Sequence, residues 1–271
     1  MDQDHYRDFW KPTPIDGQLE QPRLLAHNCQ SLAHSYYFIL CFLEHGDDSA
    51  LCLAKAPVTD CRTPLLVFYA TSNAGKLREF QLAAMQHNLR SRVRILALPN
   101  LEEIAPCEET GKTIEENAIL KGEYYSAKAP GLLVAEDSGL EVFALGGGPG
   151  VYSARFGGAG ANDDLNNQIL LEQLRGVEDR SARFVCVIAL AQKGTVLRTV
   201  RGTVEGYVLE HPRGTNGFGY DPVFFCPPLG CSFGELSPET KLKVSHRGRA
   251  LTALMTLLAD PNSGILASYG R

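Results

Sequence analysis

The sequence predicts a mixed α/β fold in which an open sheet is flanked by helices. From residue 64 onward, short apolar runs alternate with segments of helical periodicity, and paired strands follow later, which is the pattern of a mixed sheet. Hydrophobic residues make up 44% of the 271 residues and charged residues 21%, so the chain can bury a substantial core.

Residues 1–63 differ from the rest in composition. They hold several prolines, scattered histidines and one short apolar run, Ser35–Leu43, without sustained periodicity. We interpret them as an N-terminal extension that is either disordered or accessory, or as upstream sequence translated from a misplaced start codon. Residues 64–271 are then the functional domain. The apolar run is far shorter than the roughly 20 residues that cross a bilayer, so no membrane association is expected.

The first half of the domain reads as strand–helix units. Leu65–Ala70 is a continuous apolar run, typical of a strand buried on both faces, and Val93–Leu98 is a second such strand. Between them, Lys76–Leu89 has helical spacing of its apolar residues. A further helix begins at Thr113, because Thr113 and Glu116 have the spacing of a capping box.

The second half is richer in strands. Leu132–Glu136 and Leu140–Leu145 are predicted as two strands, followed by a helix over Asp163–Leu174. Two long strands are then expected on either side of a turn at Lys193 and Gly194. The last helix covers His246–Ala259.

Charge and cysteine content restrict the classes of function. The net charge of −5 argues against a broad basic surface, so no nucleic-acid partner is expected. The eight cysteines are irregularly spaced and form no C-x-x-C pair, which argues against a zinc ribbon. This usage is typical of reduced thiols, and we expect a cytoplasmic protein.

The segment TSNAGK follows the first predicted strand and opens the first predicted helix. A helix N-terminus offers unpaired N–H groups and partial positive charge, so this junction suits an anion such as phosphate. The segment is not a Walker A loop, because Leu77 follows Lys76 where that motif requires Ser or Thr. The motif alone fits a phosphate site and a plain helix cap with a surface lysine equally well. Its members are Thr71, Ser72, Asn73, Ala74, Gly75 and Lys76.

Acidic residues gather at two points of the chain. Glu108 and Glu109 precede the capped helix, whereas Glu136 and Asp137 lie between an apolar strand and the glycine-rich run ALGGGPG. Carboxylates that converge opposite a phosphate binder would suit Mg²⁺ and a water that attacks phosphorus. Single acids are usually solvated surface charges, but that explanation is weakest for Asp137.

Two later motifs carry aromatic and basic side chains. In NGFGYDPVFF, Phe218 and Tyr220 could stack on a nucleobase, although a turn with core aromatics is the better interpretation of this motif by itself. In KLKVSHRGRAL, Arg247 could bind phosphate or a purine edge, and a charged helix face is the alternative.

Taken together and in this order, the motifs resemble the inosine-triphosphate pyrophosphatase family, and the SHRGRAL ending is closest to its bacterial branch. The matching segments are ATSNAGKLREF, EETGKTIEENAILK, AEDSGLEVFALGGGPGVYSARFGG, GFGYDPVFF and ELSPETKLKVSHRGRAL. The family usually has two aspartates before Ser-Gly, whereas this chain has Glu136 at the first position.

The resemblance implies hydrolysis of dITP, ITP and XTP to the monophosphate and pyrophosphate by a Mg²⁺-dependent homodimer. It also implies an elongated mixed sheet with two lobes around a central cleft in residues 64–271. By motif, Asp137 would be the general base and a metal ligand, Glu108 the second metal ligand, and Ser138 a substrate contact. Residues 71–76 would hold the triphosphate. The base and sugar pocket would comprise Phe218, Gly219, Tyr220, Asp221, Lys241, His246 and Arg247.

Base selection has a physical explanation in such a pocket. Hypoxanthine and xanthine carry an acceptor where adenine carries an amino donor, so a donor such as Arg247 or a backbone N–H would reject ATP. An unpaired buried polar group costs about 1–3 kcal/mol. Two rival functions remain at this point: a nucleotide sensor without turnover, and a nucleotide kinase or transferase. The carboxylates argue against the first, and the missing Walker A loop argues against the second.

Overall fold

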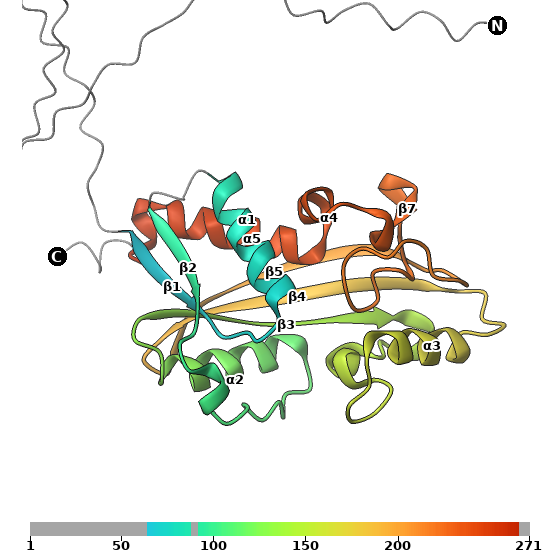
Figure 1. The fold of residues 1–271 in the computed structure, drawn as a ribbon, viewed down its shortest axis with the longest axis horizontal. Coiled ribbons are helices and arrows are strands. Elements are labelled where there is room, and N and C mark those ends of the chain that lie inside the picture. Colours follow the sequence, from blue (N-terminus) through green and yellow to red (C-terminus); the bar gives the residue numbers. More distant parts are fainter. Residues whose placement is uncertain (1–63, 88–91, 266–271) are drawn as a thin grey trace, which may run out of the picture. The chain divides into compact units, whose positions relative to one another are not determined.

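The computed structural model describes residues 64–87 and 92–265 (Figure 1). The chain divides into two units, residues 1–56 and 57–271, and every described residue belongs to the second unit. The interpretation of residues 1–63 as an extension therefore concerns residues outside the described ranges, and it stays a prediction.

A seven-stranded sheet runs through the described residues in the order β2-β1-β3-β4-β5-β6-β7. Strand β1 pairs in parallel with β2 and β3, and all the other pairs are antiparallel. This confirms the predicted mixed sheet. The strands are β1 (Leu65–Tyr69), β2 (Val93–Ala97), β3 (Leu132–Val142), β4 (Ser181–Gln192), β5 (Thr195–Val208), β6 (Phe224–Cys226) and β7 (Cys231–Ser232).

Helices cover both faces of the sheet, as Figure 1 shows. Helices α2 (Ile114–Ser126) and α3 (Asp163–Gln173) lie on one face. The other face carries α1 (Ala74–Gln86), α4 (Pro238–Val244) and α5 (His246–Ala259). Short α4 was not predicted as a separate helix; Ser245 separates it from α5 and caps the latter by accepting a hydrogen bond from Gly248 N at 3.1 Å. None of the described helices is long and apolar enough to cross a membrane.

Two large apolar clusters lie toward opposite ends of β3 and β4. One includes Val134 and Ile188 and continues into β1, α1 and α5. The other includes Leu140 and Phe184 and continues into α3 and β6. Residues 136–138 of β3 lie between the parts of the strand that contribute to the two clusters. This arrangement agrees with the two lobes that the resemblance implies.

Strand β3 corrects the prediction of two separate strands. It runs without interruption through Glu136, Asp137 and Ser138, and Phe143–Leu145 forms a 3₁₀ turn instead of a strand end. The reason is β4, which pairs with β3 continuously from Leu133 to Val142. Strand β1, in contrast, pairs only as far as Val134. The two acids therefore lie just beyond the end of β1, in the interior of β3.

The glycine-rich run folds the chain back onto β3. A Cβ atom on Gly139 would lie 2.2 Å from the carbonyl oxygen of Gly150, so the two backbones approach too closely for any side chain. Ser153 Oγ holds this contact, since it donates to Gly150 O at 2.6 Å and accepts from Leu140 N at 2.9 Å. The glycines thus permit a close backbone contact beside the acidic residues.

Helix α2 begins as predicted, but only half of the capping box forms. Thr113 Oγ1 accepts from Glu116 N at 3.1 Å. The Glu116 carboxylate does not reach back to Thr113 and instead accepts from Lys112 N at 2.6 Å.

Candidate active site

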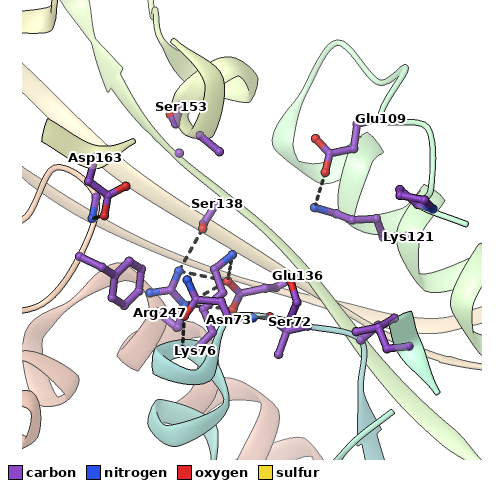
Figure 2. A pocket seen from close by; sticks show the side chains of 18 of the residues that line it. Ser72, Asn73, Lys76, Glu109, Lys121, Glu136, Ser138, Ser153, Asp163 and Arg247 are labelled. Atoms are coloured by element: carbon purple, nitrogen blue, oxygen red, sulfur yellow. Dashed lines mark hydrogen bonds and ion pairs between the residues drawn. The ribbon is translucent and has the colours of Figure 1, made fainter. Parts of the chain in front are cut away.

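A cavity of about 710 Å³ opens where β1 ends, and Figure 2 shows the side chains around it. Its walls come from the β1–α1 junction, α2, β3, the loop around Phe218, and helices α4 and α5. Segments far apart in the sequence thus meet here. The predicted site residues that line it are Thr71, Ser72, Asn73, Lys76, Ser138, Phe218, Gly219, Tyr220, Asp221, Lys241, His246 and Arg247.

Four predicted residues are not among the lining: Ala74, Gly75, Glu108 and Asp137. Gly75 still has a role in the local packing, because a Cβ atom there would lie 3.4 Å from Phe218 Cδ1. The start of α1 therefore abuts the loop that carries Phe218. Asp137 is 8% exposed and belongs to the acidic group described below, whereas the side chain of Glu108 is exposed.

The β1–α1 junction is both a helix cap and part of the cavity wall. Asn73 Oδ1 accepts from Lys76 N at 3.1 Å, and Thr71 Oγ1 accepts from Asn73 N at 3.1 Å. These bonds fix the loop as an ordinary N-cap. Thr71, Ser72 and Asn73 nevertheless border the cavity together with Lys76, so the cap and the anion site coincide.

Glu136 is held by two cations of the protein. Its carboxylate accepts hydrogen bonds from Arg247 Nε at 3.0 and 3.1 Å and from Arg247 Nη2 at 3.0 Å, and it pairs with Lys76 Nζ at 2.8 Å (Figure 2). Burial alone would raise the pKa of Glu136, but Arg247 and Lys76 hold that pKa well below its usual value. Glu136 is therefore a charged anchor for Arg247.

The ion pairs continue away from Glu136 through α1 and α4. Glu79 accepts from Arg247 Nη1 at 3.0 Å and pairs with Lys241 Nζ at 3.3 Å. Lys241 Nζ also lies 2.6 Å from Asp221 Oδ2. We call the six side chains the buried ion network. It contains three carboxylates and three cations, so its formal charges balance: Lys76, Glu79, Glu136, Asp221, Lys241 and Arg247.

The network leaves Arg247 little freedom to bind substrate. Arg247 is 2% exposed, and its guanidinium donates to Glu136, Glu79 and Ser138 Oγ. A bidentate contact with phosphate would require several of these bonds to break. The structure therefore gives Arg247 mainly the task of holding β3, α1 and α5 together.

A second, smaller acidic group contains Asp137. Lys121 Nζ lies 2.7 Å from Asp137 Oδ1 and 3.2 Å from Glu109 Oε1, so a single lysine of α2 bridges two carboxylates. Burial raises the pKa of Asp137, and Lys121 offsets part of that effect. The second oxygen of Asp137, Oδ2, is buried and has no hydrogen-bond partner among the described residues.

Glu109, not Glu108, is the loop carboxylate that borders the cavity. It pairs with Lys121 and accepts from Arg155 Nη1 at 3.0 Å. Burial would raise the pKa of Glu109, but Lys121 and Arg155 lower it overall. Figure 2 shows Glu109 and Lys121 on the side of the pocket away from Asp163.

Aromatic and imidazole rings form another part of the wall. Lys241 Nζ lies 4.4 Å and Arg247 Cζ 5.1 Å from the centroid of the Phe218 ring. The His246 ring stacks on Phe184 at 4.4 Å, and burial, with nearby Arg247 and Lys241, lowers the pKa of His246 well below its usual value. A neutral imidazole therefore borders the cavity, and its Nδ1 has no partner among the described residues.

Sequence reasoning did not identify some of the residues that form or support the cavity wall. Lys121 and Glu79 lie inside the quoted motifs, but a lysine or glutamate on a helix is ordinarily a solvated charge. Asp163 and Asn167 of α3 were predicted only as helix positions, and they bind Gly219 N at 2.6 Å and Gly219 O at 2.9 Å, respectively. No local pattern signals contacts of this kind, because each joins residues more than 50 positions apart.

The fold and the cavity together define an α/β protein whose site combines a helix N-terminus, carboxylates and an aromatic wall. The sequence profile of the Ham1 family matches residues 67–257. A protein of Acidobacterium capsulatum named dITP/XTP pyrophosphatase is 48% identical over 203 residues, which are 72% of this chain and 98% of that protein. One of the same name from Thermus thermophilus is 48% identical over 199 residues, 72% of this chain and 92% of the relative.

Solved structures agree with these sequence matches. A HAM1 protein from Coxiella burnetii is 37% identical with a TM-score of 0.64, over 72% of this chain and 98% of that one. The Ham1 protein of Staphylococcus aureus is 39% identical with a TM-score of 0.63, over 71% and 97% of the two chains. The chain belongs to the Ham1 family, and the predicted family membership is confirmed.

Proposed function

We propose that the protein hydrolyses the non-standard purine nucleoside triphosphates dITP, ITP and XTP to the monophosphate and pyrophosphate. The observation that carries this proposal is the cavity lined by Glu109, the N-terminus of α1 and the Phe218 ring, with Asp137 joined to Glu109 through Lys121. Relatives 48% identical to the chain are named dITP/XTP pyrophosphatase, which supports the same substrate class.

Asp137 is the proposed general base. A carboxylate with a raised pKa accepts a proton from water more readily than an ordinary one. The water oxygen forms a bond to phosphorus while the bridging P–O bond between the α and β phosphates breaks. The proton passes to Asp137, and pyrophosphate leaves. Lys121 Nζ donates to Asp137 Oδ1 at 2.7 Å and thereby orients the carboxylate for this step.

The charge of the cavity supports a divalent cation as cofactor. Lysines and arginine contribute four positive charges to its lining and carboxylates five negative ones, as far as the described residues show. A polyanionic triphosphate therefore needs further positive charge. Asp137 and Glu109 offer carboxylate oxygens as ligands, and Asp137 Oδ2, which has no hydrogen-bond partner among the described residues, is available to a divalent cation. When bound, Mg²⁺ would neutralise phosphate charge and lower the pKa of a ligated water.

The remaining walls suit the triphosphate and the base. Residues 71–76 bring the N-terminus of α1 and the Lys76 ammonium to the phosphates. Phe218 offers a stacking surface for the purine, and Tyr220, Asp221 and Lys241 fix the loop around it. Because Arg247 is engaged by carboxylates, we assign it to positioning Glu136 and Ser138 rather than to gripping phosphate.

The experiment that tests this function is pyrophosphate release by the purified protein with Mg²⁺ at mildly alkaline pH. dITP, XTP, dATP and dGTP are offered in parallel. Strong preference for dITP and XTP, with pyrophosphate and not single phosphate as product, supports the proposal. Tight nucleotide binding without product would favour a nucleotide sensor, and phosphoryl transfer to an acceptor would favour a kinase or transferase.

A homodimer and a cytoplasmic location are part of the same proposal. The homodimer rests on the family resemblance and the location on the cysteine usage of the chain. Light scattering coupled to gel filtration distinguishes a dimer from a monomer, and fractionation of the source cells tests the location.

A further inference from the structure

Two cysteines face each other across the hairpin at the end of the sheet. Strands β6 and β7 are antiparallel, and Cys226 is the register partner of Cys231. Only Pro227, Pro228, Leu229 and Gly230 separate them, and both thiols are free. Strand β7 is the last strand of the sheet order and has two residues (Figure 1).

The register fits the geometry of a disulfide. Directly opposite residues of an antiparallel pair point to the same face, with Cα atoms about 4.5 or 5.5 Å apart. Both spacings fall within the roughly 4.4–6.8 Å that disulfides span. The hairpin backbone therefore already holds the two cysteines at bonding range, whichever class of pair they form.

The two thiols differ in accessibility. Cys226 is 1% exposed and packs in the apolar cluster that contains Phe224 and Phe233. Cys231 is half-buried and reachable from solvent. Burial raises the pKa of Cys226, and Cys231 adds to that rise, which agrees with the proximity of the two sulfur atoms. An accessible thiol beside a buried one is the arrangement of an attacking and a resolving cysteine.

We propose that Cys226 and Cys231 form a reversible intramolecular disulfide, with a low-molecular-weight disulfide as the oxidant. The Cys231 thiolate attacks one sulfur of that oxidant, and a small thiolate leaves. Cys226 then loses its proton and attacks Cys231 Sγ, which releases the second small thiol. Two protein thiols are oxidised, and one small disulfide is reduced to two thiols.

The position of the hairpin determines what the bond does. Gly234 N donates to Asp221 O at 2.9 Å, so a backbone hydrogen bond already closes the loop that contains the hairpin. Phe218 lies outside that closed loop, and Asp221 is its first residue. The disulfide therefore tightens the sheet edge and leaves the residues of the cavity in place. Its expected effect is a higher unfolding temperature, because a crosslink constrains the unfolded chain.

Peptide mapping of the full-length protein tests the bond directly. The protein is exposed to oxidised glutathione, remaining thiols are alkylated, and trypsin releases the peptide from Gly214 to Lys241. That peptide contains Cys226 and Cys231 and no other cysteine. We expect it to be lighter by two hydrogen atoms, without an alkyl group, and to become doubly alkylatable after dithiothreitol. Two alkyl groups before reduction, a lasting glutathione adduct, or a crosslink to another peptide each overturns the proposal.

Two variants sharpen the result. In Cys226→Ala the resolving thiol is missing, so the glutathione adduct should persist on Cys231. In Cys231→Ser, oxidised glutathione should no longer raise the unfolding temperature that it raises in the parent protein. An equal rise in this variant would assign the effect to other cysteines. These readouts do not depend on pyrophosphatase activity, so they stand apart from the proposed function.

Discussion

Glu136 occupies a position in β3 where a carboxylate is surrounded by cations. Its carboxylate oxygens reach both Arg247 and Lys76. The side chain is 2% exposed, and the pairing offsets the cost of burial. Glu136 thus links α1, β3 and α5 through its ion pairs with Lys76 and Arg247.

Replacing Glu136 by glutamine should destabilise the protein strongly. Glu136→Gln removes the carboxylate that Arg247 and Lys76 share and leaves Arg247 with Glu79 alone, and removal of one member of a buried pair costs about 3–5 kcal/mol. Denaturant unfolding followed by circular dichroism measures this loss. Glu103→Gln is the matched control, since Glu103 is exposed and should change the free energy of unfolding by about 0.5 kcal/mol or less. Equal effects of the two variants would contradict the role of Glu136.

Substitutions of Glu108 and Glu109, the two neighbouring acids in the loop before α2, should have different effects. Glu109→Gln should raise the Mg²⁺ concentration needed for half-maximal activity by about tenfold or more, since a metal-bound carboxylate contributes more than about 1.4 kcal/mol. Glu108→Gln should leave that concentration nearly unchanged, because the Glu108 side chain is exposed and away from the cavity. Mg²⁺ titration of pyrophosphate release separates the two. A larger effect of Glu108→Gln would restore Glu108 as the ligand.

His246 makes the stability depend on pH. Burial holds the pKa of His246 well below its ordinary value of 6.5, so the folded protein excludes a proton that the unfolded chain accepts. The stabilisation is complete above pH 6.5 and is lost as the pH falls below it, at up to about 1.4 kcal/mol per pH unit. Denaturant unfolding between pH 7 and 5 should show a shallower slope for His246→Phe. His211→Gln, at an exposed site, should keep the parent slope.

Sequence reasoning found the site residues that recur as a motif, and it could not find their partners. Residues 71–73 and 218–221 were assigned through motifs that resemble a family, since each motif by itself also fitted a helix cap or a turn. The pairing of Lys121 with Asp137 joins residues 16 positions apart, and that of Arg247 with Glu136 joins residues 111 apart. Which carboxylate a cation reaches depends on how helices pack on the sheet, and periodicity does not contain that information.

At the scale of elements, the N-terminal turns of α3 hold the loop around Phe218. Asp163 Oδ2 accepts from Gly219 N, and Asn167 Nδ2 donates to Gly219 O, so both backbone groups of Gly219 are bound by α3. Asn167 is 7% exposed. Since Phe218 and Tyr220 flank this glycine and both line the cavity, α3 positions the proposed base pocket from outside.

Loss of one of these bonds should affect substrate affinity more than turnover. In Asn167→Leu the Gly219 carbonyl loses its donor, which costs about 1 kcal/mol and corresponds to about a fivefold rise in KM for dITP. The value of kcat should stay within about twofold, because Asp137 and Lys121 belong to other elements. Gln168→Ala, on the exposed side of the same helix, is the control. An equal fall in kcat with unchanged KM would contradict a positioning role.

Most helices and strands were predictable because the regular spacing of their apolar residues can be read from a single segment of the sequence. The α5 bounds agree with the predicted His246–Ala259, and the β4–β5 turn falls at Lys193 and Gly194, whose φ angles are 49° and 78°. Besides α4, an exception is β3, where polar residues 136–138 interrupt the apolar pattern that predicts strands. The strand continues because β4 pairs with it from Leu133 to Val142. Strand pairing involves two segments, so the sequence of β3 alone does not reveal it.

At the scale of the whole molecule, most of the described fold lies in the part that matches the family, residues 67–257. The apolar clusters are built from residues between Leu65 and Ile265. A span of 72% of this chain accounts for 98% of the relative from Acidobacterium capsulatum. That residues 1–63 are additional to this domain stays a prediction, which a truncated variant tests.

A variant that starts at Thr63 behind an initiating methionine should therefore fold and remain active. We expect its kcat/KM for dITP to stay within about twofold of the full chain, a difference of about 0.4 kcal/mol in transition-state stabilisation. Pyrophosphate release and thermal unfolding measure both properties. A variant that starts at Ala70 is the contrasting control, because it lacks β1, which pairs with β2 on one side and β3 on the other. That deletion should abolish folding. If the Thr63 variant loses folding as well, residues 1–62 belong to the domain and the predicted boundary is wrong.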